Sequence, residues 1–166
     1  MCRLYLVDDD QDVLDSLTWM LTGLGYDPLG FLSADAFLSS ADITQAGIAI
    51  LDVQMPGMDG SALLSHLTTL QSPIAVIMLT GHGNIAMAVQ AIQKGAIDFL
   101  EKPVDGDKLL SLLEKAKIQT MQYTQRNLAR EALETKLATL TPREYEVMEK
   151  VLEGKLNKVV GKPLVF

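Results

Sequence analysis

The chain alternates short apolar runs with amphipathic stretches, and this alternation limits the possible folds more than any other feature. The apolar runs are rich in Val, Ile and Leu, and the stretches between them repeat apolar residues at helical spacing. Strands that are apolar on both faces are typical of parallel sheets covered by helices on both sides. The runs are Leu4–Val7, Leu29–Leu32, Gly47–Leu51, Ile74–Leu79 and Ile97–Leu100.

The amphipathic stretches lie near residues 11–24, 34–40, 60–70 and 84–94, and a fifth begins near Gly106. Connections of this length return each strand parallel to the one before it. The sequence therefore predicts an α/β fold with a doubly wound, five-stranded parallel sheet. A chain of 166 residues with 48% hydrophobic content can bury a core of that size.

The sequence after the fifth apolar run predicts a long helix and then a short helical element. No glycine or proline interrupts the chain between Gly106 and residue 139, so the final helix should continue as a polar linker over 119–139. Further on, "TPRE" carries a capping box, with Thr141 at the N-cap and Glu144 at N3. We therefore expect three parts, at residues 1–118, 119–139 and 140–166.

Charge and cysteine content narrow the possible classes of protein. Residues 1–118 carry 15 acids and 6 bases, whereas residues 119–166 carry 6 acids and 8 bases. The first part should repel nucleic acid, and the second need not. The single cysteine, Cys2, permits no internal disulfide, which suits a reducing cytoplasm. No apolar run is long enough for a transmembrane helix, and the N-terminus lacks a signal-peptide pattern.

Polar residues follow four of the expected strands. Asp8 and Asp9 follow the first strand, Asp52 the third, Thr80 the fourth and Lys102 the fifth. In open α/β sheets, ligands bind outside the carboxyl ends of the strands. We therefore expect acids, a hydroxyl and an amine to converge on one edge, although nearly a hundred positions separate them in the sequence.

This mixture of groups suits phosphoryl chemistry with a magnesium ion. Mg²⁺ prefers carboxylate oxygens, which Asp8, Asp9 and Asp52 offer. A carboxylate can also attack phosphorus and form an aspartyl phosphate. Thr80 can donate its hydroxyl to a phosphoryl oxygen, and Lys102 supplies a positive charge.

Taken singly, each of these residues has a simpler structural role, and only their joint pattern favours a site. Asp10 keeps such a role, because we expect it to face solvent near the metal without binding it. Asp59 is expected to cap the helix that follows it.

Five blocks of sequence resemble the receiver domain of bacterial two-component response regulators. They include "LYLVDDD", "ILDVQMPGMDG", "IMLTGHG" and "AIDFLEKP", in that family's order and spacing over residues 3–118. The stretch "TGHGNIAMAVQAIQKGAIDFLEKP" resembles the FixJ-like branch in particular. The resemblance implies a flavodoxin-like fold with strand order 2-1-3-4-5 and a bound Mg²⁺.

The resemblance also implies a role for each site residue. Asp52 would be the phospho-acceptor. Asp8 and Asp9 would be the acidic pair, with Asp9 the more direct metal ligand, and the backbone carbonyl of Gln54 would be a further ligand. Thr80 and Lys102 would sense the phosphoryl group, and Phe99 would be the switch aromatic.

The segment "LTPREYEVMEKVLEGKLNK" at 140–158 resembles the opening of a LuxR/FixJ-type helix-turn-helix domain. The chain then reads "VVGKPLVF", in which Gly161 and Pro163 are poor helix residues. No recognition helix is expected, so DNA would be read only by a complete helix-turn-helix domain. The chain would be either a truncated form of a longer transcription factor or a natural short regulator that modulates dimerisation or acts as a phosphate sink.

The expected function is therefore that of a two-component response regulator, a signalling switch and not an enzyme. A sensor histidine kinase would phosphorylate it, and phosphorylation would promote a homodimer through the surface of the fourth helix and fifth strand. A Mg²⁺-dependent phosphatase that forms an aspartyl phosphate is the competing hypothesis. Phosphatases of the haloacid-dehalogenase type need a second acid two residues after the nucleophile, where this chain has Gln54.

Overall fold

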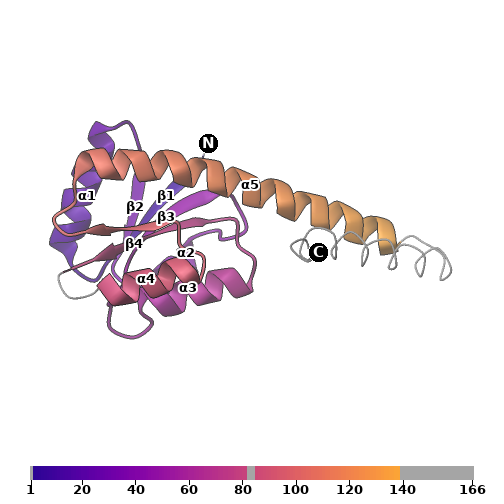
Figure 1. Cartoon of the computed structure of the whole chain (residues 1–166), viewed down its shortest axis with the longest axis horizontal. Helices are drawn as coiled ribbons and strands as arrows, with labels where there is room; N and C mark the ends of the chain where they lie inside the picture. Colours follow the sequence, from indigo (N-terminus) through magenta and orange to yellow (C-terminus); the bar gives the residue numbers. More distant parts are fainter. Residues whose placement is uncertain (1, 82–84, 139–166) are drawn as a thin grey trace, which may run out of the picture. The chain divides into compact units, whose positions relative to one another are not determined.

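The computed structural model describes residues 2–81 and 85–138. In these residues, five strands alternate with five helices (Figure 1). The elements, in chain order, are β1 (Arg3–Val7), α1 (Gln11–Gly23), β2 (Pro28–Phe31), α2 (Ala34–Ser40), β3 (Gly47–Asp52), α3 (Gly60–Thr69), β4 (Ala75–Thr80), α4 (Ile85–Gln93), β5 (Asp98–Glu101) and α5 (Gly106–Ala138).

The five strands form one parallel sheet in the order β2-β1-β3-β4-β5, as the resemblance implied. Every residue of β3 and β4 is buried, because helices cover both faces of the sheet. The prediction of a doubly wound α/β fold is therefore confirmed. The strand order reverses between β1 and β3, and ligands bind beside this point in such sheets.

Two apolar layers hold the helices to the sheet. Tyr5 and Val7 of β1 point into a layer shared with α2, α3 and α4, where Phe37 and Leu63 are fully buried. Leu4 and Leu6 point to the opposite face, where α1 and α5 pack. The alternation of side chains along a strand thus places neighbouring β1 residues in different layers. Both layers fix the strand ends from which the polar side chains emerge.

Helix α5 is fastened to the sheet by a buried hydroxyl that the sequence analysis did not single out. Thr120 is fully buried, and its Oγ1 donates to the Pro73 carbonyl at 2.6 Å. The same oxygen accepts the Gly47 backbone N–H at 2.9 Å. One threonine on α5 therefore satisfies two backbone groups where the chain enters β3 and β4.

The chain divides into two compact units, Met1–Gln125 and Arg126–Phe166. Helix α5 continues through the expected linker to Ala138. The expected helix-turn-helix segment, 140–166, lies outside the described residues. None of the helices described is both long enough and apolar enough to span a membrane.

Candidate functional site

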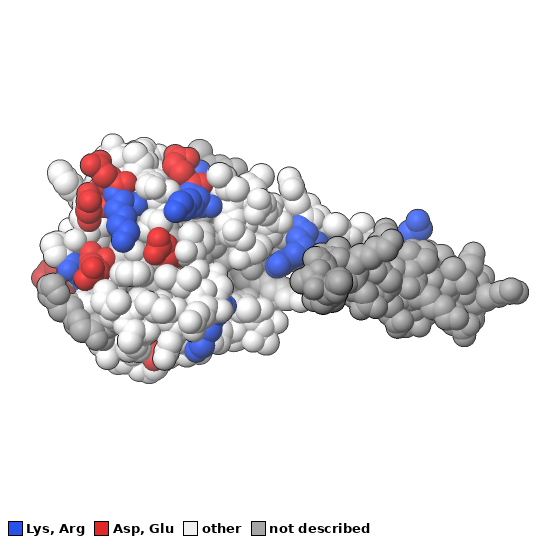
Figure 2. All heavy atoms as spheres, in the orientation of Figure 1, with Lys and Arg blue, Asp and Glu red and all other residues white. Residues whose placement is uncertain are grey.

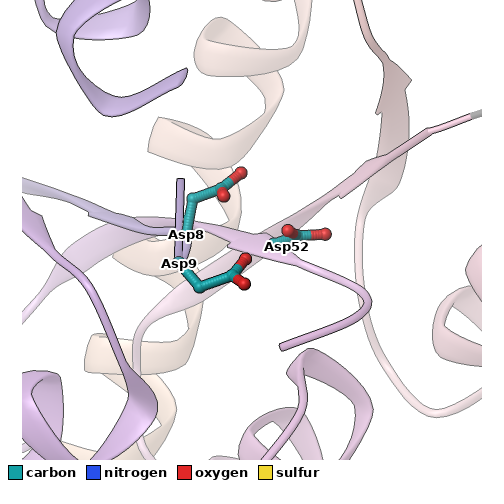
Figure 3. Close-up of side chains that lie close together, drawn as sticks. All are labelled: Asp8, Asp9 and Asp52. Carbon is teal, nitrogen blue, oxygen red and sulfur yellow. The ribbon is translucent and has the colours of Figure 1, made fainter. Parts of the chain in front are cut away.

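Three carboxylates meet at the carboxyl edge of the sheet. Asp8 and Asp9 follow β1 directly, and Asp52 is the last residue of the neighbouring strand β3. One carboxylate oxygen from each lies within 4.8 Å of the other two. Figure 3 shows the Asp8 and Asp9 side chains reaching from adjacent positions towards the same space beside Asp52. The parallel register of β1 and β3 brings these residues together, as the sequence predicted.

A lysine from the far edge of the sheet neutralises part of this negative charge. Lys102 follows β5, and its backbone N–H donates to the Thr80 carbonyl at 2.8 Å, which holds it beside β4. Its Nζ lies 3.0 Å from Asp8 Oδ2 and 3.4 Å from Asp52 Oδ2. The lysine therefore bridges two buried carboxylates, and the shorter contact is to Asp8.

Burial and repulsion make Asp52 harder to ionise than an exposed aspartate. Burial, followed by the nearby charge of Asp8, raises the pKa of Asp52 to about 6, although the Gln54 N–H and Lys102 oppose the shift. Burial alone would lower the pKa of Lys102, but its hydrogen bond to Asp8 and the charges of both carboxylates raise it. The site thus holds excess negative charge that a further cation would stabilise.

The donor set fits a magnesium ion. All three acidic side chains offer hard oxygen ligands, and Mg²⁺ is usually held by one or two carboxylates together with waters and phosphate oxygens. Asp8 and Asp52 are buried, whereas Asp9 is exposed, so an ion beside Asp9 could keep part of its hydration shell. Asp8, Asp9 and Asp52 are the residues that would hold it.

Local hydrogen bonds set the direction of the loops that carry the acids. Asp10 caps α1 by accepting the Asp12 N–H at 2.9 Å, and its own N–H donates to Asp8 Oδ1 at 2.9 Å. Asp10 is exposed, as expected, and it is the N-cap residue of α1. Asp59 caps α3 through the Ala62 N–H at 2.8 Å, also as expected.

The other residues expected at the site lie close by in the fold. Thr80 ends β4 next to Asp52, and its buried hydroxyl donates to the Gly81 carbonyl at 3.1 Å. Gln54 follows Asp52 by two positions, and its backbone N–H donates to Asp52 Oδ1 at 3.2 Å. Phe99 is half-buried on β5 and packs against the layer that contains α4.

Two residues near the site were not singled out by the sequence analysis. At Gly60, the first residue of α3, an added Cβ would overlap the Asp52 carbonyl oxygen. Lys108 of α5 places its Nζ 5.0 Å from the centre of the Phe99 ring. Gly60 lies in the quoted "QMPGMDG" segment, so its presence was visible but its close approach was not. No sequence signal marks the Lys108 contact, because it depends on tertiary packing.

Comparison with known proteins identifies a family and its branch. The model of the response regulator receiver domain matches residues 4–114. The transcriptional regulatory protein FixJ of Bradyrhizobium diazoefficiens is 36% identical over 160 residues, which cover 96% of this chain and 78% of that protein. The tetrathionate response regulatory protein TtrR of Salmonella typhimurium is 35% identical over 99% of this chain and 78% of its own length.

Solved structures agree with this similarity. The response regulator StyR superposes with a TM-score of 0.75 at 33% identity, covering 99% of this chain and 83% of that one. Full-length FixJ from B. japonicum gives a TM-score of 0.67 at 34% identity, covering 99% of this chain and 81% of that one.

Proposed function

The chain belongs to the response regulator receiver family and, within it, to the FixJ-type two-component regulators, and on this premise we propose that Asp52 accepts a phosphoryl group. The observation that carries the proposal is the gathering of Asp8, Asp9 and Asp52 within 4.8 Å, with Lys102 at 3.0 and 3.4 Å. Asp52 occupies the strand end between the acidic pair and the lysine.

The transfer is a displacement at phosphorus. An Asp52 carboxylate oxygen attacks the phosphorus of a phosphohistidine, the P–N bond breaks, and the released imidazole nitrogen takes a proton from solvent. Magnesium, when bound, neutralises the charges of the carboxylates and the incoming phosphoryl group. Lys102 binds a phosphoryl oxygen, and Asp8, its closer partner, keeps the ammonium in place. A sensor histidine kinase supplies the phosphoryl group.

The signal is a shift between two conformations that exist before phosphorylation. The Thr80 hydroxyl turns from the Gly81 carbonyl towards the phosphoryl group, and Phe99 turns inward into the space that Thr80 leaves. A change from 1:99 to 99:1 requires about 5.5 kcal/mol of differential stabilisation. Charge-assisted contacts contribute about 1.5–3 kcal/mol each, so two of them are of the required size.

The proposed output is a homodimer through the α4–β5 surface. Ile85 and Val89 of α4 are 38% and 44% exposed. Figure 2 shows acidic and basic side chains interspersed towards α5, whereas the area over α3 and α4 is largely uncharged. An apolar helix face beside the moving Phe99 suits a surface that a second copy covers after phosphorylation.

The relatives named as transcriptional regulators support an output in transcription and a cytoplasmic location. DNA binding would reside in a complete helix-turn-helix domain, and the residues that resemble its start lie outside those described.

The decisive experiment is intact-protein mass spectrometry after incubation with acetyl phosphate and Mg²⁺. The wild type should gain one labile phosphoryl group, and Asp52→Asn should gain none. The matched control is Asp59→Asn, which retains a good N-cap and should be labelled like the wild type. Equal labelling of Asp52→Asn and the wild type would show that another residue accepts the group.

A further inference from the structure

A lysine on α5 contacts the aromatic ring of β5 from the other side of the sheet. Lys108 lies in the first turn of α5, a helix that packs with α1 on one face. Phe99 packs with the α4 layer on the opposite face. Because β5 is the edge strand, the Lys108 side chain can pass around that edge and place its Nζ 5.0 Å from the ring centroid.

This contact favours one position of the ring. A cation within about 6 Å of a phenyl centroid is attracted by the negative face of the ring. Lys108 is exposed and Phe99 is half-buried, so the contact joins a solvent-exposed cation to a partly exposed ring. If Phe99 turned towards the interior, the ring would move away from the ammonium group and the attraction would be lost.

We propose that Lys108 is a positioning residue that holds Phe99 in the observed orientation and thereby keeps the unphosphorylated protein in its inactive state. The inference deepens the proposed function, because it rests on the role of Phe99 in the switch. It adds a function for α5, because the first turn of this helix, which continues to Ala138, contacts the switch residue Phe99.

The expected effect is modest. Cation–π contacts at exposed sites correspond to about a two- to fivefold change in an equilibrium. Loss of the Lys108 ammonium should therefore raise the inward population of Phe99 about two- to fivefold in the unphosphorylated protein. A small shift of this kind tunes the resting activity of a switch without replacing phosphorylation as its trigger.

The test compares Lys108→Met with two other variants of the full chain. Methionine keeps a long apolar side chain and removes the charge, whereas Lys108→Arg keeps a cation that can stack on the ring. Lys115→Met removes the same charge from another exposed position on α5. Three-bond couplings of Phe99 measured by NMR report the side-chain rotamer without phosphorylation, and the rate of labelling by phosphoramidate reports the active population.

Lys108→Met should raise both the inward rotamer population and the labelling rate about two- to fivefold, with Lys108→Arg and Lys115→Met close to the wild type. In a Phe99→Leu background, Lys108→Met should change the labelling rate no more than Lys115→Met does. The proposal is overturned if Lys108→Met and Lys115→Met shift the rotamer equally, or if the labelling effect persists without the ring. If wild-type Asp52 takes no phosphoryl group, the proposed function fails, while the rotamer measurement still decides the Lys108 contact.

Discussion

The close approach of α3 to Asp52 leads to a prediction about Gly60. An added Cβ at this position would overlap the Asp52 carbonyl oxygen and lie 2.9 Å from both the carbonyl carbon and Met78 Cε. The Gly60 N–H also donates to the Val53 carbonyl at 3.2 Å, so the start of α3 is tied to the loop after β3. In Gly60→Ala, the start of α3 and the end of β3 must therefore move apart.

The size of the effect follows from two opposing contributions. Overpacking of a tight site costs about 1–3 kcal/mol, and here one of the clashing groups is backbone, which yields poorly. Alanine in a helix gains about 0.5–1 kcal/mol over glycine. We expect Gly60→Ala to lower the free energy of unfolding by about 1–2 kcal/mol. Its labelling by acetyl phosphate should also slow, because Asp52 shifts relative to Asp8 and Lys102.

Urea denaturation and the labelling assay test this expectation against Gly23→Ala. Gly23 ends α1, and a Cβ there would meet nothing within 4 Å, so that variant should be as stable as the wild type or slightly more stable. If Gly60→Ala matched Gly23→Ala in both stability and labelling rate, the close approach of α3 would play no part in placing Asp52.

The remaining predictions concern charge, protons and the anchoring of α5. Lys102→Met should raise the pKa of Asp52 above 6 and slow labelling, since it removes the cation that both carboxylates share; NMR titration and the labelling assay measure these changes. The pKa of Asp52 is raised from 3.8 in the unfolded chain to about 6 in the folded one, so the metal-free wild type should lose stability relative to Asp52→Asn as the pH rises from 3.8 to about 6, with no further loss from this group above that range. Mg²⁺ affinity measured by calorimetry should fall as the pH drops through about 6, and an affinity without pH dependence there would contradict competition between proton and ion. Thr120→Val should cost about 2–4 kcal/mol in urea denaturation, because it leaves the Gly47 N–H and the Pro73 carbonyl without their partner; a loss no greater than that of Thr124→Val would refute this.

The sheet and the convergence of its polar strand ends could be predicted from the sequence for one physical reason. A strand buried on both faces is apolar along its length, so the first charged residue after the apolar run marks where the strand ends. Asp8 after β1 and Asp52 at the end of β3 are such markers. The parallel arrangement then places these ends on one edge, and the distances among the carboxylates confirm it.

Contacts set by side-chain paths and by helix packing could not be predicted in the same way. Lys102 was expected to bind the phosphoryl group. The sequence did not indicate that its ammonium lies closer to Asp8 than to Asp52. Lys108 reaches Phe99 around the sheet edge, and this path depends on where α5 begins relative to β5. Thr120 occurs in a polar stretch of sequence, yet it is fully buried, and two backbone partners offset the cost of burying its hydroxyl.

Paramagnetic NMR with Mn²⁺ as a stand-in for Mg²⁺ tests the central claim most directly, namely that Asp8, Asp9 and Asp52 form one divalent-cation site. At the lowest Mn²⁺ additions, the amide signals of Asp9, Asp52 and Gln54 should broaden first, and excess Mg²⁺ should restore them. The same additions to Asp52→Asn should broaden these signals much less. Broadening that is spread over exposed acids such as Asp35 and Asp107, or that Mg²⁺ does not reverse, would contradict the account.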